Sequence, residues 1–117
     1  MTFEEALVTL GVNTKEVLAR FSGNEMLMRK FVMKFPSDRS FSDTKVALSV
    51  MDKKAIETSA HTLKGVSGNL GFSSLYEASS ALVNAVRAGD DENIAPLGEK
   101  VISIGDNIVR VLSSVEE

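Results

Sequence analysis

His61 is the only histidine in a chain of 117 residues that contains no cysteine, so it is the first side chain to consider for chemistry. Lys64 follows it by three positions, and Gly65 and Gly68 follow by four and seven. A neutral imidazole has a free, nucleophilic nitrogen near neutral pH, and an ammonium group can neutralise phosphoryl oxygens. This spacing therefore suits a histidine that accepts a phosphoryl group from a partner, provided that these residues share one exposed face.

An α-helix brings these residues onto one face, because each residue advances the helix by about 100°. Relative to His61, the residues Lys64, Gly65, Gly68 and Glu57 all lie within about 60°. The opposite side of the same helix is apolar and carries Ile56, Leu63 and Leu70. An apolar stripe of this kind faces the protein core. We therefore expect His61 to face solvent near the middle of its helix.

Gly65 and Gly68 need a reason, because glycine in a helix interior costs roughly 0.8–1 kcal/mol relative to alanine. Two glycines three positions apart can allow two helices to pack closely, but that use requires a buried face. On an exposed face they leave bare backbone beside the imidazole, which indicates that another macromolecule approaches closely. We predict that Gly65, Gly68 and Glu57 contact this partner.

Other uses of a single histidine fit this sequence less well. General acid–base catalysis uses a pocket and an orienting group, and a helix surface offers no pocket. A metal site needs three or four ligands, which one histidine without cysteine cannot anchor. We therefore expect no metal and no cofactor in this chain, and a partner that supplies both the pocket and any metal.

The composition indicates a single ordinary globular domain. Hydrophobic residues make up 44% of the chain, and the length of 117 residues is that of one domain with its own core. A net charge of −3 argues against a nucleic-acid partner, which calls for a basic face. No apolar run approaches the roughly 20 residues of a membrane span, and the acidic N-terminus does not resemble a signal peptide. We expect a cytoplasmic protein that is monomeric and does not bind membranes.

Nearly every segment of the chain has the helical period, and no stretch alternates as a β-strand does. Two short helices are predicted first, over 2–10 and 13–21, each opened by capping residues. A long helix is then expected from residue 24 to about residue 51. Pro36 lies inside it, removes a backbone donor and crowds the preceding turn, so we expect this helix to be bent there.

The helix that carries His61 is predicted from Lys53 to about Asn69. Asp52 suits its N-cap and Gly71 suits its C-terminal stop. The next helix is expected to begin at a capping box over 74–77.

The last helix places apolar residues at spacings of three and four between residues 94 and 115. Pro96 is expected in its first turn, whereas nothing in the sequence explains Gly98 and Gly105 inside it.

Long helices with short connections and one apolar stripe each are typical of helical bundles. The predicted fold class is all-α, an antiparallel up-down four-helix bundle with short additional N-terminal helices. We expect one domain over residues 1–117, with the bundle core at about 24–114.

The segment Ala60-His61-Thr62-Leu63-Lys64-Gly65, followed by Gly68 and by Gly71-Phe72, resembles the signature of histidine-containing phosphotransfer (HPt) domains. The resemblance covers roughly residues 12–112 and includes the segments 17–25 and 88–90 and the residue Asp52. Pro36, Gly98 and Gly105 depart from the family pattern in the helices, away from the histidine motif.

The resemblance implies a four-helix bundle that passes a phosphoryl group between aspartates of response-regulator receiver domains in a multistep phosphorelay. His61 would be the phosphoacceptor and Lys64 would stabilise the phosphoryl group. Gly65 would let the receiver's active site close over the imidazole, and Gly68 would extend this cleared surface. The implied partners are receiver domains, which would hold the Mg²⁺, and a hybrid sensor kinase. No ATP-binding motif is present, so the resemblance implies a phosphocarrier and not a self-phosphorylating enzyme, although such transfer is also classed as histidine phosphotransfer kinase activity.

Three alternatives remain at this point. The phosphoacceptor domain of a chemotaxis-type histidine kinase has a similar motif and bundle. The dimerising histidine domain of a sensor kinase fits less well, because its motif carries a proline shortly after the histidine and here the next proline is Pro96. A helical adaptor could bind receiver domains without being phosphorylated, and it would tolerate loss of His61.

Overall fold

A computed structural model describes residues 1–116 of the protein. Over these residues the chain is entirely helical and forms no β-strand, which confirms the predicted all-α fold class. The elements in chain order are α1 (Phe3–Thr9), α2 (Thr14–Arg20), α3 (Glu25–Met33), the 3-10 helix η1 (Phe35–Ser37), α4 (Arg39–Ser49), α5 (Lys53–Leu70), α6 (Ser73–Arg87) and α7 (Asp91–Ser113).

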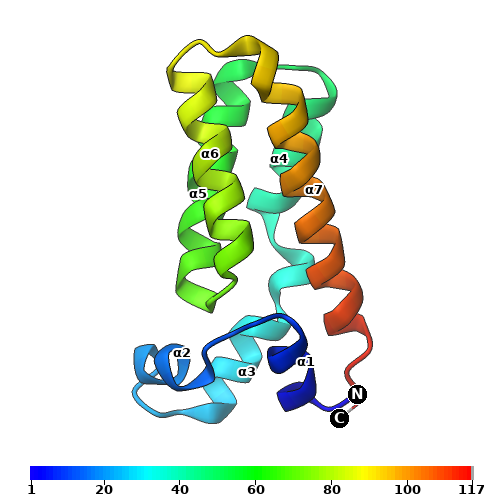
Figure 1. The fold of residues 1–117 in the computed structure, drawn as a ribbon. Coiled ribbons are helices and arrows are strands. Elements are labelled where there is room, and N and C mark those ends of the chain that lie inside the picture. The colour runs from blue at the N-terminus through cyan, green and yellow to red at the C-terminus, as the bar shows by residue number, and fades with distance from the viewer. Residues whose placement is uncertain (117) are drawn as a thin grey trace.

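Helices α4, α5, α6 and α7 stand side by side and run in alternating directions (Figure 1). Helix α5 packs against both α4 and α6, and α7 packs against α6 and α4. The three N-terminal helices lie across one end of this group. The two ends of the chain also meet there, because the Met1 amino group donates a hydrogen bond to the Ser114 carbonyl oxygen at 2.8 Å.

Side-chain caps explain where several helices begin. Thr2 forms the predicted capping box with Glu5 at the start of α1. Asn13, Asn24 and Asp52 accept hydrogen bonds from backbone N–H groups in the first turns of α2, α3 and α5. Each cap satisfies a backbone donor that has no partner inside its helix. These starts agree with the predictions from sequence.

The predicted capping box at Ser74 is wrong. Helix α6 begins at Ser73, and its N-cap position is Phe72, which supplies no side-chain hydrogen bond. The Phe72 ring is instead buried and meets the Phe35 ring edge to face, with centroids 5.2 Å apart. Aromatic packing in the core therefore replaces a polar cap at this helix start.

The prediction of one long helix bent at Pro36 is also wrong, because the helix is broken there. Helix α3 ends at Met33, and α4 starts anew behind its own N-cap Asp38, whose carboxylate accepts from the Phe41 N–H at 3.0 Å. Only the 3-10 turn η1 lies between the two segments, and Asp38 after it has an extended backbone, with φ −68° and ψ 126°, so the helical path is interrupted there. Proline prevents a continuous helix, and the new cap lets α4 take a different direction from α3.

The position of Pro96 in α7 differs from the prediction, and the packing of α7 against α4 explains the two glycines of this helix. Pro96 lies inside the helix, beyond the first turn that starts at Asp91. Gly98 and Gly105 are buried against α4, where an added methyl group would collide with the Leu48 side chain and the Phe41 ring, respectively. The absence of a side chain at both positions therefore lets α4 lie close to α7, most strictly at Gly105, because the Phe41 ring opposite it is buried.

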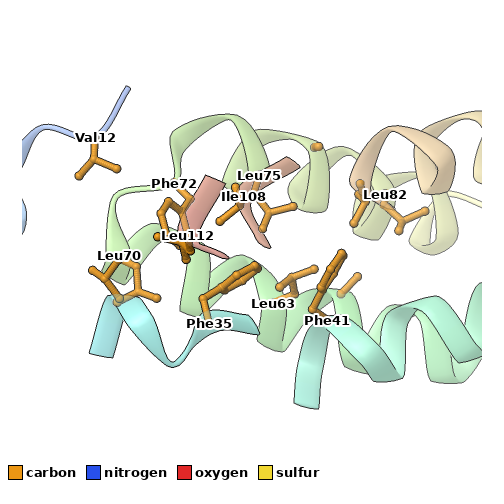
Figure 2. Packing of buried hydrophobic residues seen from close by; sticks show 14 of the residues in the cluster. Val12, Phe35, Phe41, Leu63, Leu70, Phe72, Leu75, Leu82, Ile108 and Leu112 are labelled. Atoms are coloured by element: carbon orange, nitrogen blue, oxygen red, sulfur yellow. The ribbon is translucent and has the colours of Figure 1, made fainter. Parts of the chain in front are cut away.

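The core between these helices determines which side of α5 faces outward. Figure 2 shows Phe35, Phe41 and Phe72 among aliphatic side chains from the surrounding helices. Ile56 and Leu63 of α5 belong to this cluster and are 0% exposed. Burying such a side chain stabilises the fold by about 1.5–3 kcal/mol, so the rotation of α5 about its axis is strongly fixed.

Candidate functional site

Helix α5 presents His61 on its outer side, near its midpoint. The helix begins at its Asp52 cap and ends at Gly71, which has a left-handed conformation with φ +80°. His61 and Gly65 are exposed, opposite the buried stripe that contains Leu63. The exposure predicted from the helical wheel is thus what the structure shows.

The imidazole of His61 forms no hydrogen bond with any of residues 1–116. The adjacent hydroxyl group of Thr62 donates to the carbonyl oxygen of Thr58 at 3.2 Å and so turns back along the helix. His61 is therefore exposed, and its ring nitrogens are not engaged by hydrogen bonds within residues 1–116.

Gly65 and Gly68 lie in different surroundings, although both were expected to leave bare backbone on the surface beside His61. A methyl group added at Gly65 would meet nothing within 4 Å, so the backbone there is open surface. A methyl group at Gly68 would lie 3.0 Å from Cδ2 and 3.3 Å from Cε2 of Tyr76. The structure thus places bare backbone beside His61 at Gly65, whereas an aromatic ring from α6 covers Gly68.

Lys64 is half-buried and lies over the same ring. Its Nζ atom is 5.5 Å from the centroid of the Tyr76 ring. This is within the roughly 6 Å at which a cation is attracted to an aromatic face. The structure therefore joins three residues, Lys64, Gly68 and Tyr76, of which sequence reasoning found only the first two. Helical periodicity could not find Tyr76, because it lies on a different helix.

Arg20 is a second neighbour that sequence reasoning missed. Its Nη1 donates to the carbonyl oxygens of Gly68 and Asn69 at 2.8 and 3.0 Å, and its Nη2 donates to Glu16 Oε1 at 2.8 Å. Carbonyl groups in the last turn of a helix lack intrahelical partners and attract cations. Arg20 thus attaches α2 to the end of α5, and no local pattern pairs residues that are 48 positions apart.

Glu57 of α5 forms an ion pair with Arg87 of α6. Its Oε2 accepts a hydrogen bond from Arg87 Nε at 2.8 Å. This hydrogen bond lowers the pKa of Glu57 below its ordinary value, and the charges of Arg87, Lys54 and His61 act in the same direction. Lys53, one turn away, pairs with Asp91 at 2.7 Å. Glu57 is therefore held as a carboxylate at the edge of the His61 surface.

The lowered pKa of Glu57 predicts a measurable pH dependence. In Arg87→Ala, the titration midpoint of the Glu57 carboxyl group, followed by ¹³C NMR, is expected to rise toward the ordinary glutamate value. Since the folded-state pKa is depressed, the pair stabilises the protein above the ordinary glutamate pKa, and this stabilisation is lost as the pH falls through the lowered value. The effect on stability is expected to be small, because Arg87 is exposed to solvent and Glu57 is only partly buried.

Arg110→Ala is the matched control, because Arg110 lies on α7 and bonds to Asn107. It is expected to leave the Glu57 titration unchanged. If Arg87→Ala also leaves the midpoint of Glu57 where it is in the parent protein, then the ion pair does not form in solution.

No group of three or more His, Cys, Asp or Glu side chains within residues 1–116 is placed to hold a metal ion. None of the described helices combines the length and the apolar character needed to cross a membrane.

A family model described as "Hpt domain" matches residues 27–113. The matched range runs from within α3 to the end of α7, so it contains every residue of the site from Glu57 to Tyr76 and leaves α1 and α2 outside. No curated protein and no solved structure matches the chain.

Proposed function

The chain belongs to the Hpt domain family, whose members carry out histidine phosphotransfer in two-component signalling, and from this premise we propose that His61 is its phosphoacceptor. In this proposal His61 takes a phosphoryl group from a receiver-domain aspartate and passes it to another response regulator in a multistep phosphorelay. The observation that carries the proposal is the exposed imidazole, which has no hydrogen-bond partner among residues 1–116 and lies beside the open backbone of Gly65.

The proposed step is a displacement at phosphorus. A nitrogen of the neutral His61 imidazole attacks the phosphorus of an aspartyl phosphate, so an N–P bond forms while the O–P bond to the aspartate breaks. The aspartate leaves as a carboxylate, and its negative charge balances the positive charge that develops on the imidazole. Transfer to the next regulator reverses these events. Lys64 neutralises charge on the phosphoryl oxygens, and the receiver domain supplies Mg²⁺ and the enclosing pocket.

Hpt domains are phosphocarriers rather than enzymes, and we propose the same role for this chain. Receiver domains and a hybrid sensor kinase are the proposed partners, and the protein is proposed to act as a cytoplasmic monomer. We further propose that α4 to α7 constitute the antiparallel up-down four-helix bundle expected from the sequence, with α1 and α2 as additional N-terminal helices. The packing of α5 on both α4 and α6, and of α7 on α6 and α4, supports this arrangement.

The proposal is tested by incubating the protein with a receiver domain that carries a ³²P-labelled aspartyl phosphate. Label is expected to move to this protein and to be labile in acid but stable in base, as a phosphohistidine is. Label that is stable in acid would contradict a histidine acceptor. Binding of the receiver without any transfer of label would identify the protein as an adaptor. Transfer from an ATP-bound chemotaxis-type kinase core, with none from receivers, would favour the phosphoacceptor domain of such a kinase.

Gly65→Gln is expected to slow transfer by about 10-fold or more, because a long side chain one turn from His61 keeps the receiver's active site from closing. The substitution is expected to preserve the fold, since the position opens onto solvent. The measurement is the single-turnover rate of label transfer, with circular dichroism and the melting temperature as checks of folding.

Glu99→Gln places the same amide side chain at an exposed position of α7 and serves as the control for this prediction. Its transfer rate is expected to equal that of the parent protein. A Gly65→Gln rate equal to the parent's would contradict the close approach inferred at this glycine.

A further inference from the structure

The ring of Tyr76 lies against α5, close to both Gly68 and Lys64. Two ring carbons, Cδ2 and Cε2, approach the place where a Cβ atom of residue 68 would be, at 3.0 and 3.3 Å. The Lys64 ammonium group is 5.5 Å from the centroid of the same ring. Because Lys64 and Gly68 are one helical turn apart, the ring spans the surface between them.

Two features hold the segments that carry the ring and its neighbours in place. Tyr76 is in the first turn of α6, directly after Leu75, which is 0% exposed and anchors this turn in the core. The end of α5 under the ring is held by Arg20 through the carbonyl oxygens of Gly68 and Asn69. Tyr76 as a whole is 40% exposed, so its ring can contact a lysine at the surface.

We propose that Tyr76 is a positioning residue for Lys64, and that Gly68 lacks a side chain because the Tyr76 ring occupies that space. This inference rests on the proposed phosphoacceptor function of His61. Lys64 is a flexible side chain, and fixing it costs conformational entropy. Contact with the ring face restricts the ammonium group to the outer side of α5, which also carries His61, before the phosphoryl group arrives, so less ordering is needed during transfer.

Gly68 has a role in packing against Tyr76 and not in docking. From the sequence, this glycine was expected to extend the surface that a receiver approaches. The structure shows an internal reason for it, since a Cβ atom at this position would lie 3.0 Å from the Tyr76 ring and would push the ring outward by a few tenths of an ångström. Gly65, where an added methyl group would meet nothing within 4 Å, keeps its role in docking.

A double-mutant cycle on the rate of label transfer tests the positioning role. Tyr76→Leu removes the aromatic face and is expected to slow transfer by about 2- to 5-fold, the factor that corresponds to an exposed cation–π contact. Tyr76→Phe keeps the ring and is expected to transfer at the parent rate. In a Lys64→Met background, Tyr76→Leu is expected to have no further effect, because the residue through which it acts is absent.

NMR gives a second readout that does not depend on transfer. In the parent protein and in Tyr76→Phe, the protons on Cε of Lys64 are expected to show an upfield ring-current shift, and Tyr76→Leu is expected to remove it. Gly68→Ala is expected to reduce this shift by pushing the ring away. Gly65→Ala is the matched control and is expected to leave it unchanged.

The outcomes separate this inference from the proposed function. If the parent protein accepts no label at all, the proposed function fails, and a transfer role for Tyr76 fails with it. If the parent accepts label and Tyr76→Leu transfers at the parent rate, only the positioning role is overturned. Equal slowing by Tyr76→Leu with and without Lys64 would show that the ring acts through packing and would also overturn it.

Discussion

His61→Gln is expected to accept no detectable label from a phosphorylated receiver domain while folding as the parent protein does. Glutamine has a side-chain amide, whose nitrogen is not nucleophilic, and the chain contains no other histidine that could replace His61. The fold should not change, because the imidazole is exposed and forms no hydrogen bond with residues 1–116. Substitutions at such surface positions usually change the free energy of unfolding by no more than about 0.5 kcal/mol.

Receiver binding is the control that separates loss of the phosphoacceptor from loss of docking. The variant keeps Gly65, Lys64 and Glu57, so its affinity for the receiver is expected to stay within a few-fold of the parent's. Loss of both binding and label would show that the docking surface had been disturbed instead of the acceptor. Acid-labile label in the variant equal to that of the parent would place the phosphoryl group on some other residue and overturn the phosphocarrier assignment.

The exposed face of α5 could be predicted from the sequence because everything needed to place it is local. A period of 3.6 residues sets His61 opposite Leu63, and the large energy of burying Leu63 and its neighbours decides which side faces the core. The Asp52 cap and the Gly71 stop are local as well, since each acts within one turn of the helix end.

The features that sequence analysis missed depend on contacts between distant segments. Arg20 and Tyr76 reach α5 from α2 and α6, and neither contact leaves a periodic trace in the sequence. The start of α6 is set by the burial of Phe72 and not by a polar cap. Pro36 could be recognised as a disturbance, but a bend and a break differ only in whether a new cap forms, and Asp38 provides one.

Gly98 and Gly105 show the same limitation most clearly. They lie seven positions apart on one side of α7, and from the sequence alone they predict only a lower helix propensity. The structure places α4 against both of them. A small residue becomes a requirement only when the side chain opposite it is known, and here these are Leu48 and Phe41.

Gly105→Ala is expected to lower the free energy of unfolding by about 2 kcal/mol. The added methyl group would overlap the Phe41 ring, which is 5% exposed and stacks on Phe35 with centroids 5.7 Å apart, so the ring has little room to move. Overpacking of a core typically costs about 1–3 kcal/mol, and the upper end applies to a ring held in this way. The higher helix propensity of alanine offsets about 1 kcal/mol of that cost.

Gly65→Ala is the matched control, because it makes the same chemical change at a helical position where the new methyl group meets nothing within 4 Å. It is expected to raise the free energy of unfolding by about 0.8–1 kcal/mol. Urea denaturation followed by circular dichroism measures both variants. Opposite signs for the same substitution would show that the contact with Phe41 decides the outcome, and a stabilising Gly105→Ala would contradict the close packing of α4 on α7.

Replacing Phe41 tests whether its ring causes the loss of stability in Gly105→Ala. The ring atoms closest to the added methyl group are Cε1 and Cζ, which leucine lacks. Phe41→Leu alone is expected to be destabilising, because it leaves space in the core. In the double variant the alanine methyl group fills part of that space, so the combined loss is expected to be smaller than the sum of the two single losses. Strict additivity would mean that Gly105 is required for some reason other than the approach of α4.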